Sequence, residues 1–391
     1  MRVAIVTESF LPSLNGVTTS VCRVLDRLRT LGHDAVVIAP SPAPATYAGF
    51  PVRAISSIAV RQFHVGLPTG DVEAELRRFR PDVVHVASPF VLGARGLKAA
   101  HRLRLPSVAI YQTDMPSYIA QHGQVAGRLT AQAAASAAWK WVRSIHSLAT
   151  TTLAPSKAAL ADLEQAGVPR SDLWGRGVDT ALFRPQWRED AAARTLRAGL
   201  RPGGEVLVGY VGRLAPEKDL HLLTDLVGLP GCRLVLVGDG PSRPVLAEQL
   251  GRRADELGLP PSRRPAFLGR REGEDLARAY AALDVFVHTG TRETFGQTLQ
   301  EAAATGLPVV APAVGGPLDI VDHGTTGLLF DPTRPGALTA CVGSLVGDAE
   351  TRRAMGEAGL ARVRDRGWDA IVDQLVGHYE GAIARHAAAL V

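Results

Sequence analysis

The chain is poor in lysine, in cysteine and in long apolar runs, and each shortage excludes a class of protein. Lysine supplies only four of the 43 basic residues, at Lys98, Lys140, Lys157 and Lys218, so the setting of each lysine is informative. The three cysteines lie far apart and outside metal-ligand spacings, which excludes a disulfide framework and predicts buried, reduced thiols. No run of about eighteen apolar residues occurs, which excludes an ordinary membrane-spanning helix. Because the N-terminal apolar run is also too short for a signal peptide, we expect a cytoplasmic protein.

The length of the chain and its distribution of charge indicate how many domains to expect and which kind of partner the protein could bind. With 391 residues it is too long for one ordinary core, so two domains are expected. Residues 1–185 hold 20 Lys and Arg against 12 Asp and Glu, whereas residues 186–391 hold 23 against 26. The basic first part favours an anionic partner, such as a phosphorylated acceptor or a membrane surface. A solvated surface explains the excess equally well, and no nucleic-acid partner is expected.

Buried-strand runs alternate with helical segments along the whole chain. This alternation predicts an α/β protein with parallel sheets covered by helices on both faces. The stretch 184–204, rich in Arg, Pro and Gly, carries no strand, so we expect the linker there and domains at 1–185 and 186–369. The last helical segment, at about 370–391, is expected to pack back on the first domain. The expected strands cover residues 3–7, 34–40, 82–88, 107–113, 205–212, 233–240, 266–269, 284–290 and 308–316.

A glycine stands between the first strand and the first helix, in the segment TESFLPSLNGVTTSV. Gly16 precedes the helix, where backbone N–H groups attract anions and a missing Cβ lets a phosphate approach closely. The segment is not a G-x-G-x-x-G fingerprint, so it does not indicate a dinucleotide-dependent dehydrogenase. On spacing alone, a turn glycine and a phosphate-facing glycine remain equally good interpretations.

Two cations follow the first strand of the second half, in GRLAPEKD. Arg213 and Lys218 lie at a strand end and helix start, where ligands of such sheets bind. A departing nucleoside diphosphate carries two to three negative charges, which a guanidinium and an ammonium can neutralise. The chain has no Asp-x-Asp triplet, so we expect no metal and a diphosphate held by these cations. A solvated charge pair is the alternative.

Two carboxylates lie eight residues apart in HTGTRETFGQTLQEAAATG. Glu293 stands in the loop after a strand, and Glu301 stands within the helix that follows. Carboxylates accept hydrogen bonds from vicinal diols, so one can hold sugar hydroxyls and the other a ribose. A dipole-favouring loop charge and a surface helix residue are the alternatives. The N–H groups at the start of this helix are expected to face a phosphate, at Phe295, Gly296, Gln297 and Thr298.

Together these motifs resemble the retaining glycosyltransferases of family 4. The resemblance covers nearly the whole chain, through PSLNGVTTSV, GRGVDTALFRP, GRLAPEKDL, LVGDGP, RETFGQTLQE and GGPLDIVDHGTTGLLF. It implies a GT-B fold, in which two Rossmann-like domains face each other across a cleft. Within the family, YQTDMPSYIAQHG, DVVHVASPF, WGRGVD and FGQTLQEA look most like actinobacterial GDP-mannose-dependent α-mannosyltransferases of the MgtA type.

The resemblance also implies roles for individual residues. It assigns the donor diphosphate to Arg213 and Lys218, the ribose to Glu301 and the transferred sugar to Glu293. Gly16 would face the diphosphate from the other domain. Further donor-binding positions implied by the resemblance are Gly238 and Asp239 in LVGDGP, with Phe267 and Leu268 at the base. No cofactor is implied, because the nucleotide sugar is a co-substrate.

The first domain departs from the family pattern at one position. Many relatives carry a His where this chain has Gln112, and a glutamine cannot donate a proton or carry the charge of an imidazolium. Asp114 is the nearest ionisable candidate for the catalytic group. His85 and Tyr118 are further acceptor-side candidates, although a hydrogen-bonded core histidine explains His85 at least as well.

The expected reaction moves a hexose, with retained configuration, from GDP-mannose or another nucleotide sugar to a glycolipid or polyprenyl-type acceptor. Residues 126–147 place Trp139, Lys140, Trp141 and Arg143 on one helix, as an interfacial helix requires. A packed Ala-rich helix is the alternative. Interfacial binding would put the protein on the inner face of the cell membrane, in contact with anionic lipid.

Other functions remain compatible with the motifs. The fold could serve a UDP-glucose or UDP-sulfoquinovose transferase, or a transferase acting on inositol phosphate. A phosphorylase would need a pyridoxal-phosphate lysine in the second domain, where Lys218 is the only lysine and sits in a phosphate-binding setting. A binding protein without turnover would keep Arg213 and Lys218 but would not need Glu293.

Overall fold

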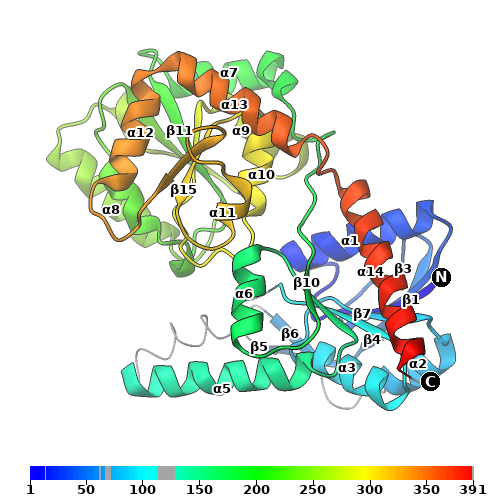
Figure 1. Cartoon of the computed structure of the whole chain (residues 1–391). Coiled ribbons are helices and arrows are strands. Elements are labelled where there is room, and N and C mark those ends of the chain that lie inside the picture. The colour runs from blue at the N-terminus through cyan, green and yellow to red at the C-terminus, as the bar shows by residue number, and fades with distance from the viewer. Residues whose placement is uncertain (14, 61–62, 67–71, 113–127, 390–391) are drawn as a thin grey trace. The chain divides into compact units, whose positions relative to one another are not determined.

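The computed structural model describes residues 1–13, 15–60, 63–66, 72–112 and 128–389 (Figure 1). The chain forms two compact units, one of Met1–Gly177 with Trp368–Val391 and one of Val178–Gly367. The chain passes from the first unit to the second between residues 177 and 178, which is before the expected linker at 184–204. Residues 184–204 are not a linker between the units, because they fold on the second unit. Their 3-10 helix η2 (Pro185–Glu189) and helix α7 (Ala191–Leu200) contribute Trp187 and Leu196 to the apolar core of that unit.

The first unit is built on an eight-stranded sheet in the order β10-β9-β8-β7-β1-β2-β4-β3. All neighbouring strands pair in parallel except β3 and β4, so the predicted parallel sheet is present. A separate antiparallel hairpin joins β5 (Ser57–Val60) to β6 (Phe63–Gly66). The strands of the large sheet are β1 (Arg2–Val6), β2 (Asp34–Pro40), β3 (Thr46–Tyr47), β4 (Phe50–Ile55), β7 (Val83–Val86), β8 (Ser107–Ile110), β9 (Thr151–Ala154) and β10 (Ser171–Leu173).

Helices connect the parallel strands of the first unit. Asn15 begins the first of them, because its side chain accepts hydrogen bonds from the N–H groups of Val17 and Thr18. Ser156 caps the helix after β9 in the same way. The described helices of this unit are α1 (Gly16–Thr30), α2 (Val72–Phe79), α3 (Leu92–Arg102), α5 (Arg128–His146), α6 (Lys157–Gln165) and α14 (Trp368–Ala388).

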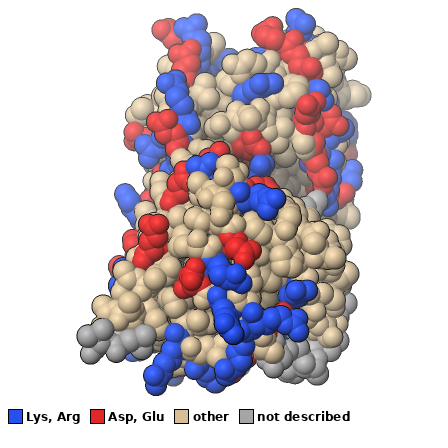
Figure 2. Space-filling model, turned by 90° about the vertical axis from the view of Figure 1, so that its right-hand side faces the viewer, with Lys and Arg blue, Asp and Glu red and all other residues tan. Residues whose placement is uncertain are grey.

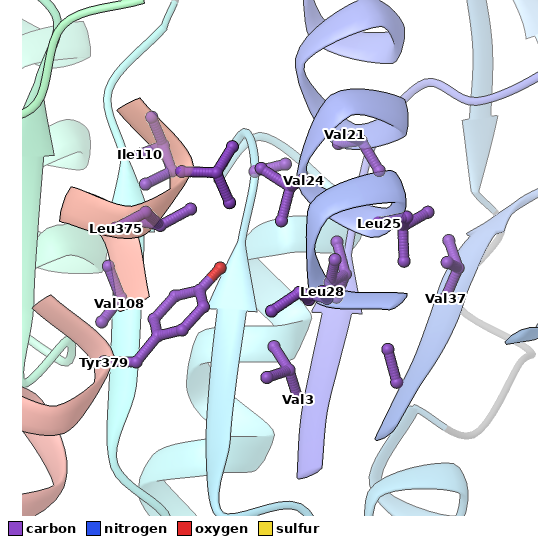
Figure 3. Packing of buried hydrophobic residues seen from close by; sticks show 14 of the residues in the cluster. Val3, Val21, Val24, Leu25, Leu28, Val37, Val108, Ile110, Leu375 and Tyr379 are labelled. Carbon is purple, nitrogen blue, oxygen red and sulfur yellow. The ribbon is translucent and has the colours of Figure 1, made fainter. Parts of the chain in front are cut away.

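Helix α14 returns to the first unit and covers one face of its sheet beside α1. Figure 3 shows Leu375 and Tyr379 of α14 facing Val108 and Ile110 of β8, with the apolar side chains of α1 alongside. The indole of Trp174 donates to the carbonyl of Ile371 at 2.8 Å, which adds a hydrogen bond to this apolar contact. Each large apolar side chain buried here contributes roughly 1.5–3 kcal/mol, so α14 is an integral part of the first unit.

Basic side chains gather on the first unit. On the face shown in Figure 2, Lys and Arg cluster toward the bottom of the view, whereas acidic and basic residues alternate toward the top. Part of the basic charge is paired, because Arg77 and Arg102 both contact Glu73, at 2.8 Å. The excess of basic charge seen in residues 1–185 is therefore a surface property of this unit.

The second unit has a six-stranded parallel sheet in the order β13-β12-β11-β14-β15-β16. Numbered within the unit, this order is 3-2-1-4-5-6, the arrangement of a Rossmann sheet with its switch point between β11 and β14. The strands are β11 (Val206–Val211), β12 (Cys232–Val237), β13 (Ala266–Gly269), β14 (Val285–Val287), β15 (Val309–Pro312) and β16 (Gly327–Phe330). The two expected Rossmann-like halves are both present.

Two apolar cores lie on the two faces of this second sheet. One core takes its buried helical residues from α7, α9, α10, α11 and α13, and the other from η4, α8, α12 and α13. The helical elements after α7 are η3 (Pro216–Lys218), η4 (Leu220–Leu226), α8 (Arg243–Glu256), η5 (Pro261–Arg263), α9 (Gly273–Ala282), α10 (Gln297–Ala304), α11 (Pro317–Ile320), α12 (Ala337–Gly347) and α13 (Ala349–Val363).

Candidate active site

An ion pair stands at the switch point of the second sheet, where the loops after β11 and β14 meet. Lys218 ends η3, and Glu293 lies in the loop between β14 and α10. The Nζ of Lys218 donates to Oε2 of Glu293 at 2.6 Å, and only 25% and 18% of the two side chains is exposed. Because ligands of such sheets bind beyond the carboxyl ends of the strands at the switch point, this pair marks the candidate site.

Hydrogen bonds fix the two loops to each other. The hydroxyl of Thr289 donates to the carbonyl of Lys218 at 2.7 Å. The carboxylate of Asp219 accepts from the N–H of Thr291 at 3.0 Å and from its hydroxyl at 2.6 Å. Sequence reasoning missed Asp219, Thr289 and Thr291, whose only signal was that they are short polar residues beside the predicted motifs. They hold the backbone that carries the ion pair.

Arg213 stands at the start of the same loop after β11. Its guanidinium donates to Glu217 at 2.8 Å, and 46% of its side chain is exposed. Its carbonyl accepts from the hydroxyl of Tyr210 at 3.1 Å, and burial raises the pKa of Tyr210 so that this hydroxyl keeps its proton. The backbone of Arg213 is thus fixed, while its charged end is in an exposed pair that contributes little to stability.

Glu301 occupies a different environment from Glu293. It lies on α10, and its Oε2 accepts from the hydroxyl of Tyr280 on α9 at 2.8 Å. Burial of the carboxyl group raises the pKa of Glu301 to about 7, although the hydrogen bonds from Tyr280 and Gln297 lower it. Tyr280, another residue that sequence reasoning missed, therefore orients this carboxylate and favours its charged form.

The start of α10 approaches the segment after β15 very closely. Gly296 takes a positive φ of 104°, and Phe295 is buried. A Cβ on Gly316 would lie 2.4 Å from the carbonyl oxygen of Phe295, and the N–H of Gly316 donates to the carbonyl of Glu293 at 2.7 Å. Only glycine fits there, so Gly316 fixes the backbone of the Glu293 loop. The structure places Gln297 and Thr298 in the first turn of α10, as the sequence predicts.

The loop after β12 packs backbone against backbone with the loop after β11. A Cβ on Gly238 would lie 1.9 Å from the carbonyl oxygen of Gly212, and one on Gly240 would lie 2.3 Å from that of Leu214. Asp239 pairs with Arg243 at 3.2 Å on the surface. Glycine is therefore required at both positions of LVGDGP because the loops after β11 and β12 approach each other too closely for a side chain.

Phe267 and Leu268 lie on β13, the edge strand of the second sheet, and both are half-buried. Phe267 packs against the core that contains η4 and α8, whereas Leu268 packs against the core that contains α7 and α9. Successive residues of a strand point to opposite faces, so these two side chains do not line one face together. The role of this strand at the base of the nucleotide stays a prediction.

In the first unit, Arg176 connects two of the predicted positions. Its guanidinium donates to the carbonyl of Gly16 at 3.0 Å and to Oε1 of Gln112. Gln112 in turn donates to the carbonyl of Ala87. Gln112 follows β8, Arg176 follows β10 and Gly16 begins α1, so these residues come together at the carboxyl edge of the first sheet. The sequence motif WGRGVD contained Arg176, but nothing in it indicated this partner.

His85 is a core residue. It lies on β7 with 2% of its surface exposed, and its Nδ1 shares a hydrogen bond of 2.6 Å with the hydroxyl of Tyr379 on α14. Burial lowers the pKa of His85 to about 3, so the ring is neutral. The structure therefore favours the core interpretation over an acceptor-side role. Of the other acceptor-side candidates, Gln112 is held by Arg176 and Ala87, and Tyr118 lies outside the described residues, as does Asp114, the candidate for the catalytic group.

Comparisons with known proteins agree with this geometry. One family model, described as "Glycosyltransferase Family 4", matches residues 14–182, and another, "Glycosyl transferases group 1", matches residues 193–362. The chain is 42% identical over 399 residues to a GDP-mannose-dependent alpha-mannosyltransferase of Mycobacterium tuberculosis. It is 44% identical over 396 residues to the protein of that name from Mycolicibacterium smegmatis, and each alignment covers 98% of both chains. The chain belongs to glycosyltransferase family 4.

The fold agrees with the family. HepE from Anabaena, solved in complex with UDP, superposes on this glycosyltransferase with a TM-score of 0.76 at 22% identity, over 97% of this chain and all of the other. Together with the family models, this likeness confirms the predicted GT-B fold. The prediction that the chain is a glycosyltransferase is confirmed as well.

Glu8 is a titratable group of this glycosyltransferase that sequence reasoning missed. It follows β1 at the switch point of the first sheet, and its Oε1 accepts from the N–H of Gly93, at the start of α3, at 2.7 Å. Burial raises the pKa of Glu8 to about 7, although the N–H groups of residues 90–93 lower it. Glu8 lies in the segment TESFLPSLNGVTTSV, where sequence reasoning considered Gly16 alone, and the topology reveals its place beside the start of α3.

The described residues contain neither a metal-binding cluster nor a membrane-spanning helix. Among the described residues, no group of three or more His, Cys, Asp or Glu side chains is arranged to hold a metal ion. Within the same part of the chain, no helix is both long and apolar enough to span a membrane.

Proposed function

We propose that this glycosyltransferase moves mannose from GDP-mannose to a hydroxyl group of a lipid-linked acceptor. The observation that carries the donor is the identity of 42% and 44%, over 98% of the chain, to two proteins named GDP-mannose-dependent alpha-mannosyltransferase. The ion pair of Lys218 and Glu293 at the switch point supports a donor site in the second unit.

The charges of the site suit a nucleoside diphosphate leaving group. Arg213 and Lys218 stand on one loop, and their positive charges would neutralise the diphosphate as its bond to the sugar breaks. Glu301, oriented by Tyr280 at 2.8 Å, would accept hydrogen bonds from the ribose hydroxyls. Glu293 would accept hydrogen bonds from the sugar hydroxyls. These cations would do the work of a metal ion, so the proposed reaction needs none.

Membership of family 4 supports a reaction that retains the anomeric configuration. In the proposed front-face route, the departing diphosphate takes part in accepting the proton of the acceptor hydroxyl. The phosphate oxygens would then need to be held on the side from which the acceptor approaches. The backbone N–H groups at the start of α10, at residues 296–298, are suited to hold them.

A melting-temperature screen tests the donor base. A ligand raises the melting temperature according to its concentration relative to its affinity, so GDP, UDP and ADP at equal concentration can be ranked. We expect GDP to give the largest shift and GDP-mannose to support transfer. A larger shift with UDP, and turnover of UDP-glucose instead, would replace this proposal by a UDP-sugar transferase.

An aromatic pair on the surface of the first unit supports a lipid-linked acceptor. Phe90 and Trp141 are 38% and 37% exposed, and their rings meet edge to face with centroids 6.0 Å apart. Lys140 and Arg143 are exposed on the same helix, α5. Aromatic rings beside basic residues are suited to the interface of an anionic membrane, so we assign peripheral membrane contact to this surface.

Sedimentation with vesicles tests this contact. The wild-type protein should sediment with phosphatidylglycerol-containing vesicles and not with phosphatidylcholine vesicles. Trp141→Ser together with Phe90→Ser should abolish binding, whereas Val245→Ser, an exposed apolar residue of the second unit, should not. Equal sedimentation of the double variant and the wild type would show that this surface is not the contact.

A further inference from the structure

A buried histidine lies beneath the ion pair. His288 follows β14 directly and is 2% exposed. Among the described residues, neither ring nitrogen makes a hydrogen bond of good geometry to a side chain, and the backbone of Gly290 is the one polar group close enough to raise the pKa of the ring by hydrogen bonding. Buried polar groups almost always have partners, because an unmade hydrogen bond costs about 1–3 kcal/mol. The ring of His288 therefore has hydrogen-bonding capacity that the described side chains do not use.

The ring is directed at the ion pair. Its Nε2 lies 3.5 Å from Oε2 of Glu293, the same oxygen that Lys218 contacts at 2.6 Å. Tyr210 stacks on the ring with an interplanar angle of 18° and centroids 6.4 Å apart. A Cβ on Gly290 would lie 3.1 Å from Nε2 and 3.4 Å from Cδ of Lys218, so the glycine keeps this space open. A small movement of Glu293 would close the 3.5 Å to a hydrogen bond.

In the proposed function, the ion pair opens when the donor binds. The negative charge of Glu293 offsets the positive charge that Lys218 would present to the diphosphate, so moving the ammonium onto the phosphate oxygens strengthens that contact. When the donor displaces Lys218, the carboxylate of Glu293 loses a charged partner within a largely buried site. A buried carboxylate that loses its partner is costly unless another donor replaces it.

We propose that His288 is a positioning residue, whose Nε2–H takes hold of Glu293 when Lys218 moves to the donor diphosphate. This inference rests on the proposed function, because it gives Lys218 and Glu293 their roles toward the donor. The histidine would fix one oxygen of Glu293 and leave the other for the sugar hydroxyls.

The charge state of the ring suits this role. Burial lowers the pKa of His288 to about 4, and Lys218 lowers it as well, against the opposing effects of Glu293, Asp219 and a hydrogen bond with the backbone of Gly290. The neutral ring carries one N–H, and the neighbouring carboxylate favours the tautomer that carries it on Nε2. A neutral donor can hold Glu293 without cancelling the negative charge that the sugar hydroxyls require.

Two substitutions separate the hydrogen bond from the packing of the ring. His288→Phe keeps the ring and its stacking on Tyr210 but removes the N–H, whereas His288→Gln places an amide N–H near the position of Nε2. We expect His288→Phe to lower kcat/KM about tenfold to a hundredfold, as for loss of a buried hydrogen bond to a charged group. His288→Gln should recover most of this loss. Melting temperatures establish that both variants are folded.

Calorimetry distinguishes the positioning role from general damage to the site. His288→Phe should bind GDP as the wild type does, but it should lose the part of the affinity for GDP-mannose that the mannose adds. In the double variant His288→Phe/Glu293→Gln, the two losses should not add, because both act through the same carboxylate. Equal damage by Phe and Gln, or an undiminished rate in His288→Phe, would overturn the inference.

The same measurements separate this inference from the proposed function. If the wild type does not bind GDP or turn over GDP-mannose, the proposed donor is wrong, and the variants are then compared with the nucleotide sugar that the wild type uses. If the wild type turns over GDP-mannose and His288→Phe is unimpaired, the donor assignment stands and the role of His288 is wrong.

Discussion

The Nζ of Lys218 and the Oε2 of Glu293 lie 2.6 Å apart, although the two residues are 75 positions apart in the sequence. Each comes from the loop after one of the two strands that flank the switch point. The pair satisfies two charges that would otherwise be costly to bury, and it also withholds both charges from a donor. In the proposed function, donor binding exchanges this contact for contacts with the diphosphate and the sugar.

Removing the charge of Glu293 should separate nucleotide binding from turnover. In Glu293→Gln, no carboxylate at position 293 competes with the diphosphate for Lys218. GDP should therefore bind as tightly as it does to the wild type, or more tightly. Turnover should fall about a hundredfold or more, because the contact with the transferred sugar is lost. Calorimetry with GDP and initial rates with GDP-mannose measure the two effects. A near-normal rate would contradict the sugar-holding role.

Removing the ammonium of Lys218 should weaken diphosphate binding. Lys218→Ala is expected to lower GDP affinity at least about tenfold, because a charge-assisted contact with phosphate disappears and Glu293 is left without its cation. The matched control is Arg252→Ala, which removes a positive charge from an exposed pair on α8. Unchanged GDP affinity in Lys218→Ala would take this lysine out of the site.

Donor affinity should depend on pH through Glu301. Burial raises the pKa of this carboxyl group to about 7. Ribose hydroxyls that donate to it favour its charged form, so affinity should be full above pH 7 and fall below it, by up to about tenfold per pH unit. Tyr280→Phe removes a hydrogen bond that lowers this pKa, so the fall should begin at a higher pH. Donor KM across the pH range measures this shift, and Glu301→Gln should abolish it.

The hydrogen bond between His85 and Tyr379 should contribute to the stability of the first unit. Tyr379→Phe leaves a buried imidazole without this partner, so we expect a loss of about 1–3 kcal/mol in unfolding free energy, measured by urea denaturation. Tyr47→Phe, which removes a longer hydroxyl contact of 3.3 Å to Asp26, is the matched control. The folded pKa of His85, about 3, lies below its value of 6.5 in an unfolded chain. Its stabilising contribution is therefore present above pH 6.5 and lost as the pH falls toward 3.

Activity should survive removal of divalent metal ions. Arg213 and Lys218 supply positive charge for the diphosphate, so EDTA is expected to leave the rate within about twofold of its untreated value. The measurement is the initial rate with GDP-mannose after dialysis against EDTA. Loss of activity that is restored by Mg²⁺ or Mn²⁺ would contradict the proposed use of cations alone.

Much of the fold could be predicted from the sequence, because buried parallel strands have a simple signature. The runs around β1, β2, β11, β12 and β13 are continuous apolar segments followed by Gly, Pro or polar residues. The sequence did not indicate β3, β4 or β16, and it also missed the short strands β9 and β10 and the hairpin of β5 and β6. The strands β5, β6, β9 and β10 are three or four residues long, and their polar residues resemble those of loops.

The domain boundary and the partners of the site residues could not be predicted in the same way. The stretch 184–204 looked like a linker because Arg and Pro dominate it, but its helix α7 buries Ala193 and Leu200 in the second unit. The pairing of Lys218 with Glu293, and the place of His288 below them, depend on the order of strands in the sheet. The spacing of residues along the sequence does not give the order of strands in the sheet. The sequence could therefore indicate which charged residues belong to the site, but not which of them pair.

The second unit is inserted in the first, between Gly177 and Trp368. Val178 and Gly367 form a parallel bridge, so the chain enters and leaves the second unit at neighbouring positions. During synthesis on the ribosome, residues 178–367 can fold as soon as they emerge. The sheet of the first unit, although made earlier, keeps an uncovered apolar face until α14 has been translated. The unit that begins first is thus completed last. A polypeptide truncated near residue 367 would have a folded second unit attached to a first unit that lacks α14.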